Sequence, residues 1–454
     1  MGYAPMHCVS LLRRSAAIAL ALAASLLGAG CGGAASSTTT TICRDPSVCT
    51  VQEAAESMPS GSNTTEIVVD SGPKGGFALM VTNVPYVTVT VCSPGSSTEC
   101  ATIDHVLLDT GSYGLRLLKS KVSPVALPGI PIAAEPTSGT PAGDAAECYA
   151  FVLGAVWGPL ARADVLIGGE KADSVNIQLI DDGAVLSPPV PPNCTQQSQS
   201  GLMNSVSDLQ ANGILGVGVV GVDCGVTCLT NTYAGGYIVY YSCPPGGAAC
   251  EAAGLPVESQ VQNPVTRFAV NNNGTMVVMP KLPDLGAMEA RGRLVFGIGT
   301  QANNQLPAGA TMYQINTNPA SPEYLYVALQ VASRNYTQSF IDTGANAMFF
   351  DEPTLSQACT VSSGHAGSWY CPTSTWRQTA TLTDSAGATG TFSLAVTSAD
   401  VLFNSGAAAF ATLAGSAGQA TETFALGMPF FYGRTVSTSI WGQTLSSNGP
   451  WYAF

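Results

Sequence analysis

One pattern occurs twice in this chain and constrains its fold more than any other feature. In the first copy, residues 86–91 alternate valine with threonine, which predicts a half-buried strand. After a turn, the apolar residues 106–108 lead directly into Asp109-Thr110-Gly111-Ser112. The second copy begins with an alternating strand over 325–331 and ends in Asp342-Thr343-Gly344-Ala345. Each copy therefore predicts two paired strands followed by an acidic loop.

Each copy is also followed by a later apolar strand that ends in glycine. These two stretches are Asn212-Gly213-Ile214-Leu215-Gly216 and Phe424-Ala425-Leu426-Gly427. In the second copy we expect the turn between the paired strands at residues 333–335. A strand, turn and strand unit closed by a further strand, occurring twice, predicts two related all-β lobes.

With these motifs the chain resembles the pepsin-like aspartic peptidases, a family related to the retroviral peptidases. Residues 164–169 with 175–178 resemble the strand pair that follows the family's active-site flap. Residues 292–297 resemble the opening of its second lobe, and 426–434 resemble its closing stretch. The resemblance covers about residues 80–445, and it also suggests a bacterial lipoprotein branch of unknown function. It implies an all-β, two-lobed pepsin-like acid-protease fold, in which each lobe is a barrel-like sheet with one Asp-Thr-Gly loop.

The resemblance assigns roles to the two loops. Asp109 and Asp342 would be the catalytic pair, which shares one proton because two adjacent carboxylates cannot both ionise. The ionised member would activate a water for attack on a peptide carbonyl, and the protonated member would stabilise the oxyanion. No cofactor and no metal is needed. The supporting loop residues would be Thr110, Gly111, Ser112, Thr343, Gly344 and Ala345, the last also being common in retroviral relatives.

The stretch that corresponds to the flap departs from the family pattern. The family has a tyrosine in a Tyr-Gly-x-Gly setting, whereas counting back from Gly168 places Phe151 at that position. Tyr149 lies two residues away on the same strand face, and Trp157 is a third candidate that could equally be a core residue. Arg116 occupies the position of an aromatic residue that usually supports the flap.

Composition narrows the function classes further. The net charge of −13 and the lack of any Lys/Arg cluster exclude a nucleic-acid binder, because an acidic chain repels phosphate backbones. Only three histidines occur, and His7 lies in the leader. Histidine-based metal sites and catalytic triads would therefore depend on His105 or His365, which we expect to be ordinary polar side chains.

The first 65 residues predict export. Arg13 and Arg14 precede an apolar run over 16–27, which is typical of a signal peptide and too short for a comfortable membrane span. The run ends in a sequence similar to a bacterial lipobox, so we expect lipidation at Cys31; the alternative is ordinary cleavage nearby with Cys31 as a free thiol. The expected parts are a signal peptide (1–30), a lipid-anchored flexible tether (31–65), an N-terminal lobe (66–263) and a C-terminal lobe (264–454).

Cysteine spacing agrees with an exported protein. Without Cys8 and Cys31, twelve of the 14 cysteines remain. Most lie in close pairs and two are left over, which predicts six disulfides whose connectivity the sequence does not fix. A metal site at Cys224 and Cys228 is disfavoured, because other cysteine ligands would already be oxidised. The close pairs are Cys43/Cys49, Cys92/Cys100, Cys224/Cys228, Cys243/Cys250 and Cys359/Cys371, and the remaining two are Cys148 and Cys194.

These observations predict an exported, lipid-anchored aspartic-type endopeptidase in the bacterial envelope, on the periplasmic face of the outer membrane or at the cell surface. The expected partners are an extended peptide or protein substrate and, through the anchor only, a membrane; we expect a monomer. A second hypothesis is a catalytically silent envelope lipoprotein that binds a peptide or envelope component in the cleft. The two aspartates favour the enzyme, and the altered flap favours the binding protein.

Overall fold

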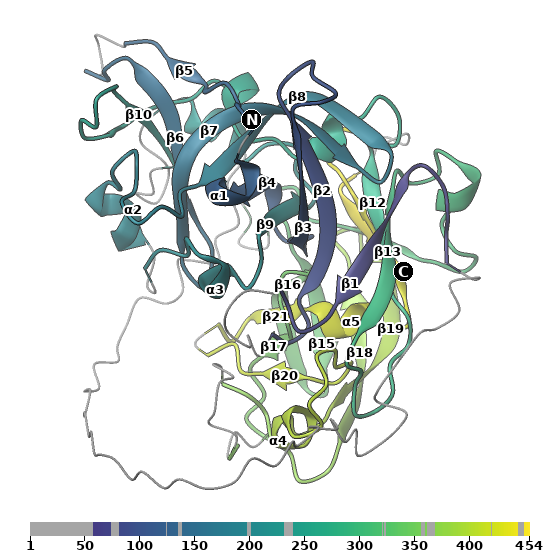
Figure 1. The fold of residues 1–454 in the computed structure, drawn as a ribbon. Coiled ribbons are helices and arrows are strands. Elements are labelled where there is room, and N and C mark those ends of the chain that lie inside the picture. The colour runs from purple at the N-terminus through teal and green to yellow at the C-terminus, as the bar shows by residue number, and fades with distance from the viewer. Residues whose placement is uncertain are drawn as a thin grey trace, which may run out of the picture.

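The computed structural model describes residues 58–73, 81–123, 125–134, 139–197, 201–230, 239–319, 321, 324–355, 359–360, 368–418, 420–443 and 449–454. Strands dominate this part of the chain, and its helices are short (Figure 1). The many valines, threonines and glycines explain the preference, since β-branched residues suit strands and glycines suit the turns between them.

The strands of the first half are β1 (Thr64–Val69), β2 (Pro85–Cys92), β3 (Cys100–Asp109), β4 (Tyr113–Leu118), β5 (Pro131–Ile132), β6 (Gly143–Ala150), β7 (Ala155–Ile167), β8 (Glu170–Ile180), β9 (Gly213–Val217), β10 (Tyr240–Cys243) and β11 (Glu251–Ala252). Those of the second half are β12 (Gly274–Val278), β13 (Ala290–Phe296), β14 (Met312–Gln314), β15 (Val327–Val331), β16 (Arg334–Ile341), β17 (Met348–Phe350), β18 (Trp376–Thr383), β19 (Thr389–Val396), β20 (Ala414–Gly415), β21 (Thr423–Leu426), β22 (Thr435–Ser439) and β23 (Trp451–Ala453).

The helices connect strands or cover their ends. The α-helices are α1 (Lys119–Val122), α2 (Pro192–Gln197), α3 (Val206–Leu209), α4 (Ala399–Phe403) and α5 (Met428–Phe431). The 3₁₀ helices are η3 (Gly225–Cys228), η4 (Val257–Ser259), η5 (Pro264–Arg267) and η6 (Ala302–Asn304). Among the described residues, no helix is long and apolar enough to cross a bilayer.

Two sheets organise the strands. The larger runs in the order β11-β10-β6-β7-β8-β4-β9-β3-β2-β1-β13-β12-β22-β23-β14, with β5 beside β6. A further pairing of β7 with β2 closes its strands β7, β8, β4, β9, β3 and β2 into a six-stranded barrel. The second sheet has seven strands in the order β19-β18-β15-β16-β21-β17-β20. The all-β, two-lobed pepsin-like prediction is confirmed.

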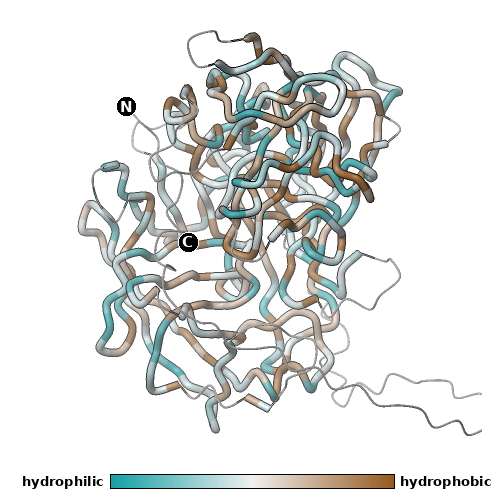
Figure 2. The backbone as a smooth tube through the Cα atoms, turned by 90° about the vertical axis from the view of Figure 1, so that its left-hand side faces the viewer, coloured by the Kyte–Doolittle hydropathy of each residue, from teal (hydrophilic) through white to brown (hydrophobic). Residues whose placement is uncertain are grey.

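The larger sheet joins sequence-distant segments. β1 pairs with β13 along six residues, from Thr64↔Val295 to Val69↔Ala290. Since β12, β22, β23 and β14 continue from β13, this sheet contains strands from both sides of the predicted lobe division at residues 263 and 264. One large apolar cluster, with members from Ile67 to Tyr452, extends through both halves, and smaller clusters lie beside it. Figure 2 shows hydrophobic segments running through the interior and hydrophilic segments on outer loops.

The repeated units form hairpins, with one difference from prediction. β2 and β3 pair antiparallel, and Cys92 and Cys100 face each other across the hairpin. β15 and β16 also pair, but the connecting turn is Ala332–Ser333, and Arg334 already pairs with Val331. The prediction of a turn at 333–335 was therefore wrong, because the turn lies earlier, at 332–333. The reason is a tight two-residue turn in which Ala332 adopts a positive φ of 53°. Alanine rarely adopts this conformation, so an alanine in a sequence does not indicate such a turn.

Candidate active site

The two acidic loops begin where equivalent strands end. β3 runs parallel to β9, with Leu108 opposite Leu215 and Asp109 opposite Gly216. β16 runs parallel to β21, with Ile341 opposite Leu426. The later apolar strands noted in the sequence thus lie beside the strands that carry the aspartates. Figure 1 shows β3 and β16 approaching each other where the two halves of the molecule meet.

Two threonines tie the loops together by reciprocal hydrogen bonds. The Thr110 N–H donates to Oγ1 of Thr343 at 3.0 Å, and the Thr343 N–H donates to Oγ1 of Thr110 at 3.0 Å. The Thr343 hydroxyl then donates to the carbonyl of Leu108 at 2.6 Å, and the Thr110 hydroxyl donates to that of Ile341 at 3.4 Å. All four bonds are buried and cross between the sequence repeats, so they fix the two loops relative to each other.

The glycines of the two loops make room for the opposite carboxyl group. A Cβ atom added to Gly111 would lie 2.5 Å from Cγ of Asp342. A Cβ atom added to Gly344 would lie 2.7 Å from Oδ1 of Asp109 and 3.1 Å from Oδ1 of Asp342. Any side chain at these positions would collide with an aspartate. Glycine is therefore required by the close approach of the two loops.

Asp109 and Asp342 differ in their hydrogen-bond donors. Asp109 is only 6% exposed and accepts the Gly111 N–H at 2.8 Å and the Ser112 hydroxyl at 2.5 Å. Asp342 is partly exposed and accepts the N–H of Gly344 at 2.7 Å. The residue that corresponds to Ser112 beside Asp342 is Ala345, which has no hydroxyl.

The two carboxyl groups interact directly. Burial raises the pKa of Asp342 well above its usual value, and the neighbouring charge of Asp109 and a hydrogen bond with its carboxyl raise it further. The N–H groups of Gly344 and Gly111 oppose this rise in pKa without cancelling it. The arrangement thus favours a proton on Asp342.

The β6–β7 hairpin holds the three flap candidates, and they have different environments. Tyr149 is partly buried and packs against the Phe151 ring in a tilted arrangement, at a centroid distance of 4.9 Å. Phe151 begins the tight turn, where its N–H donates to the carbonyl of Gly154, and the following Val152 and Leu153 are 62% and 73% exposed. Trp157 is fully buried on β7 and donates its ring N–H to the carbonyl of Pro188, so it is placed in the core.

Tyr149 is the candidate that the electrostatics connect to the aspartates. Its ring covers the Arg116 guanidinium at 3.8 Å, a cation–π contact. Burial raises the pKa of Tyr149, and the charge of Asp109 is among the groups that raise it further. No hydrogen bond of the Tyr149 hydroxyl is found within the part of the chain that the structure describes.

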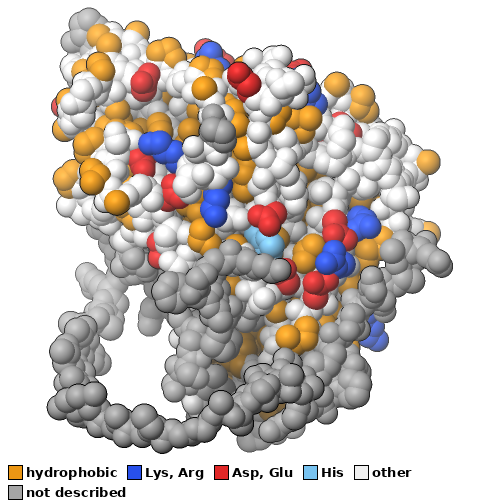
Figure 3. All heavy atoms as spheres, viewed as in Figure 1, with side chains coloured by type: hydrophobic (Ala, Val, Ile, Leu, Met, Phe, Trp, Pro, Cys, Tyr) orange, Lys and Arg blue, Asp and Glu red, His pale blue; other side chains and the backbone are white. Residues whose placement is uncertain are grey.

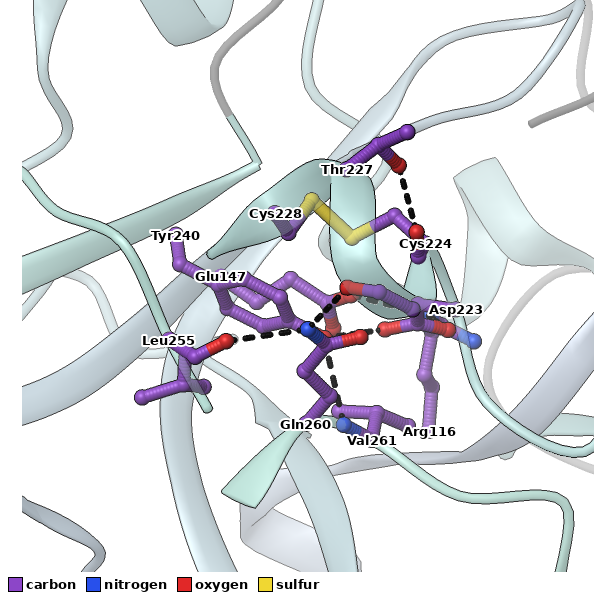
Figure 4. Close-up of a disulfide and its surroundings, with 11 residues drawn as sticks. Arg116, Glu147, Asp223, Cys224, Thr227, Cys228, Tyr240, Leu255, Gln260 and Val261 are labelled. Atoms are coloured by element: carbon purple, nitrogen blue, oxygen red, sulfur yellow. Dashed lines mark hydrogen bonds and ion pairs between the residues drawn. A yellow bond between two sulfur atoms is a disulfide. The ribbon is translucent and has the colours of Figure 1, made fainter. Parts of the chain in front are cut away.

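Arg116 lies at the centre of a buried ionic cluster (Figure 4). Its Nη2 donates to Oε1 of Glu147 and to Oδ1 of Asp223, both at 2.8 Å. Its Nη1 donates to the carbonyl of Tyr113 at 2.6 Å. The Tyr240 hydroxyl donates to Oδ2 of Asp223 at 2.6 Å. The side chains of Arg116 and Glu147 are completely buried. Arg116 stands out in the sequence, whereas its hydrogen-bond partners Tyr113, Glu147 and Asp223 do not.

Comparison with known proteins defines the family. The model of a family described as "Protein of unknown function (DUF3443)" matches residues 59–454. The chain belongs to this family. Among solved structures, an aspartic proteinase from Irpex lacteus matches the DUF3443 chain with 13% identity and a TM-score of 0.45, covering 86% of this chain and 96% of the proteinase. None of the curated proteins matches it.

Disulfides in the described part of the DUF3443 chain follow the expected spacing. Five are present, and they agree with an exported protein. The sixth predicted pair, Cys43/Cys49, and the proposed lipidation site Cys31 lie outside the described residues, as does His365. The five bridges are Cys92–Cys100, Cys148–Cys194, Cys224–Cys228, Cys243–Cys250 and Cys359–Cys371.

The remaining candidate ligands have other roles. His105 contacts Asp70 at 3.3 Å and Asp104 at 3.1 Å, and the hydrogen bond with Asp70 raises the pKa of its imidazole. In the described residues, one group with metal-ligand spacing comprises Cys359, Cys371 and Asp400. Its two cysteines are joined in a disulfide and have no thiolate to offer.

Proposed function

We propose that this DUF3443 protein is an aspartic-type endopeptidase. The observation that carries the proposal is the direct contact of the Asp109 and Asp342 carboxyls, held by reciprocal threonine bonds between two repeated loops. A buried pair of acids that shares a proton is costly to maintain, and such perturbed pairs concentrate at catalytic sites. Acid–base hydrolysis by two carboxyls is the chemistry that this pair supports best.

The two aspartates would have distinct roles in the resting enzyme. Asp109, whose anion accepts the Gly111 N–H and the Ser112 hydroxyl, would take a proton from the attacking water. Asp342, whose pKa is raised, would donate a hydrogen bond from its proton to the developing oxyanion. The water oxygen would attack the peptide carbonyl, and the proton that it loses would pass to the amine that leaves.

The substrate would be an extended peptide or protein segment. Tyr149 and the exposed tip residues Val152 and Leu153 would contact it from the β6–β7 hairpin. The protein would act as a monomer in two lobes, 66–263 and 264–454, without a cofactor or metal. Figure 3 shows a face on which charged side chains are scattered among larger uncharged areas.

We further propose that residues 1–30 are a signal peptide and that the segment between Cys31 and β1 tethers the protein to the bacterial envelope through lipidated Cys31. The expected tether, 31–65, overlaps β1, which begins at Thr64 and pairs with β13. The apolar run that ends at Cys31 supports this proposal, as does the disulfide content of the folded part. Membrane fractionation of wild type and Cys31→Ser tests it. The variant should move to the soluble fraction, and a wild-type protein that is already fully soluble would contradict the anchor.

Digestion of an unbiased peptide library tests the enzymatic proposal. Wild type, Asp109→Asn and Asp342→Asn should be incubated with the library between acid and neutral pH, with cleavage sites read by mass spectrometry. The proposal requires cleavage by wild type and loss of the same cleavage sites in both variants. If folded wild type cleaves nothing, the function moves to the second hypothesis, an envelope lipoprotein that binds a peptide or envelope component in its cleft.

A further inference from the structure

The buried cluster of Arg116, Glu147 and Asp223 contains one more acid than it has bases. The three side chains come from β4, from β6 and from the segment before η3, and all are buried. Both acids accept from the same donor atom, Nη2 of Arg116, at 2.8 Å each. With both acids ionised, the cluster would hold an uncompensated negative charge away from water, which is strongly unfavourable.

The hydrogen bonds show which acid is the weaker anion. Both oxygens of Asp223 accept a bond, one from Arg116 and one from the Tyr240 hydroxyl. The Tyr240 hydroxyl oxygen in turn accepts the Val261 N–H at 3.1 Å, so its own proton is committed to Asp223. In Glu147, Oε1 accepts from Arg116, whereas Oε2 is buried and no donor among the described residues reaches it.

We propose that Glu147 keeps its proton and donates it to Asp223, so that the neutral cluster positions the β6–β7 hairpin against β4. The proton turns Oε2 of Glu147 from an orphan acceptor into a donor and balances one arginine with one carboxylate. Burial and the adjacent Asp223 both raise the pKa of Glu147, against the opposing effect of Arg116, and a Glu147–Asp223 hydrogen bond raises it further.

The cluster is well placed to act on the site. β4 follows the Asp109 loop directly, and β6 carries both Glu147 and, two residues later, Tyr149. Arg116 contacts both of these side chains: its Nη2 donates to Glu147, and the face of its guanidinium lies over the Tyr149 ring. Glu147 and Arg116 are therefore positioning residues for the hairpin, and this role holds whether or not the aspartate pair cleaves peptides.

Glu147 is surrounded by groups from β4, β7, β8, β10 and the loop before η3. Arg116 faces it from β4, Asp223 from the loop before η3, and Tyr240 from the paired residue of β10. On β8, the uncharged Gln178 donates to the Glu147 carbonyl, and the residue paired with Glu147 on β7 is Gly158. On its own strand the nearest titratable group is Tyr149, whose pKa is raised by burial.

The direction of the pH effect follows from the raised pKa. In the open form, the β6–β7 hairpin would leave β4 and Glu147 would have its ordinary pKa; in the closed form its pKa is raised. The protonated acid therefore stabilises the closed form fully at pH values below the ordinary pKa. This contribution is lost as pH rises through the raised pKa. Between these limits, the opening constant should increase about tenfold for each pH unit, because one proton is released on opening. The hairpin is thus held best in acid.

Hydrogen exchange of the hairpin tests the proposal without any cleavage assay. The experiment uses peptides covering 143–167 in Asp109→Asn protein and in the same protein with Glu147→Gln, so that the aspartate pair is constant. Glutamine matches glutamic acid in shape, donates to Asp223 and cannot ionise. At each pH, the protection of the hairpin amides in the protein with Glu147 is divided by that in the Glu147→Gln protein. Between the ordinary and the raised pKa, this ratio should fall about tenfold per pH unit. Identical pH dependence in both proteins would overturn the proposal.

An infrared measurement covers the case in which Glu147→Gln does not fold. The C=O band of a protonated carboxylic acid should persist at neutral pH in Asp109→Asn protein and should weaken when Asp223→Asn is added. The second change leaves one acid beside Arg116, so Glu147 then ionises. A band of unchanged intensity in Asp223→Asn, or its absence before that change, would show that Glu147 is not the proton holder.

Discussion

The hydroxyl of Ser112 donates a hydrogen bond to Oδ2 of Asp109, whereas the corresponding Ala345 has no hydroxyl to offer Asp342. The two halves of an otherwise symmetric arrangement therefore stabilise different charge states. Donors to a carboxylate favour its ionised form, and their absence favours the protonated form. This difference between the repeats acts in the same direction as burial and the charge of Asp109, which raise the pKa of Asp342, and it fits the proposed role of Asp109 as the base.

Ala345→Ser should reduce this asymmetry. A new hydroxyl beside Asp342 would stabilise its anion and lower its pKa, by about one to two units if the bond is as strong as typical bonds to charged groups. Because the proposed mechanism requires the proton on Asp342, the alkaline limb of the kcat/KM profile should move to lower pH by the same amount. The control is Ser112→Ala, which removes support from Asp109 and should not move that limb downward. An unmoved limb in Ala345→Ser would contradict the assignment.

Gly111→Ala should disable the site by steric collision. The added methyl group would lie 2.5 Å from Cγ of Asp342, so the loops must separate. Such overpacking costs about 1–3 kcal/mol of unfolding free energy and should abolish cleavage. Gly129→Ala is the matched control, because its nearest neighbour would be Oδ1 of Asp144 at 3.5 Å, an ordinary contact. Urea unfolding and peptide cleavage measure the two effects. Equal behaviour of the two variants would show that the loops are not in close contact.

Removing the Cys148–Cys194 disulfide should destabilise the protein more than removing Cys224–Cys228. The first closes a separation of 46 residues and the second a separation of four, and the entropy gained by the unfolded chain grows with loop length. The expected losses in unfolding free energy are about 4 and about 2 kcal/mol for the serine double variants. Denaturant unfolding of both variants checks the order, and a larger loss for the short loop would refute it.

Much of the candidate site could be predicted from the sequence because the relevant signals are local. Each Asp-Thr-Gly motif follows directly on its strand, and the later apolar stretches that end at Gly216 and Gly427 have a recognisable pattern. The turn after Val331 was misplaced because a two-residue turn with alanine at positive φ has no glycine or asparagine to mark it.

The ionic cluster could not be predicted because its members are far apart in the sequence. Glu147 and Asp223 lie 31 and 107 residues from Arg116, and isolated acids in strands and loops carry no pairing signal. A hint was present in β4, where an arginine lies within an otherwise apolar strand and so requires buried counter-charges. The pairing of β1 with β13 is likewise a long-range contact that local patterns do not encode.

The central claim, that Asp109 and Asp342 act as one proton-sharing catalytic unit, is tested most directly by a mutant cycle. It measures kcat/KM on one cleaved peptide, across pH, for wild type, Asp109→Asn, Asp342→Asn and the double variant. Each single change should lower kcat/KM by about 100- to 10,000-fold, and the double change should lower it little further, because the two residues work together. Wild-type activity should be highest where the pair holds one proton and should fall as pH rises through the raised pKa of Asp342. Retained activity in either single variant, or losses that multiply in the double variant, would contradict the account.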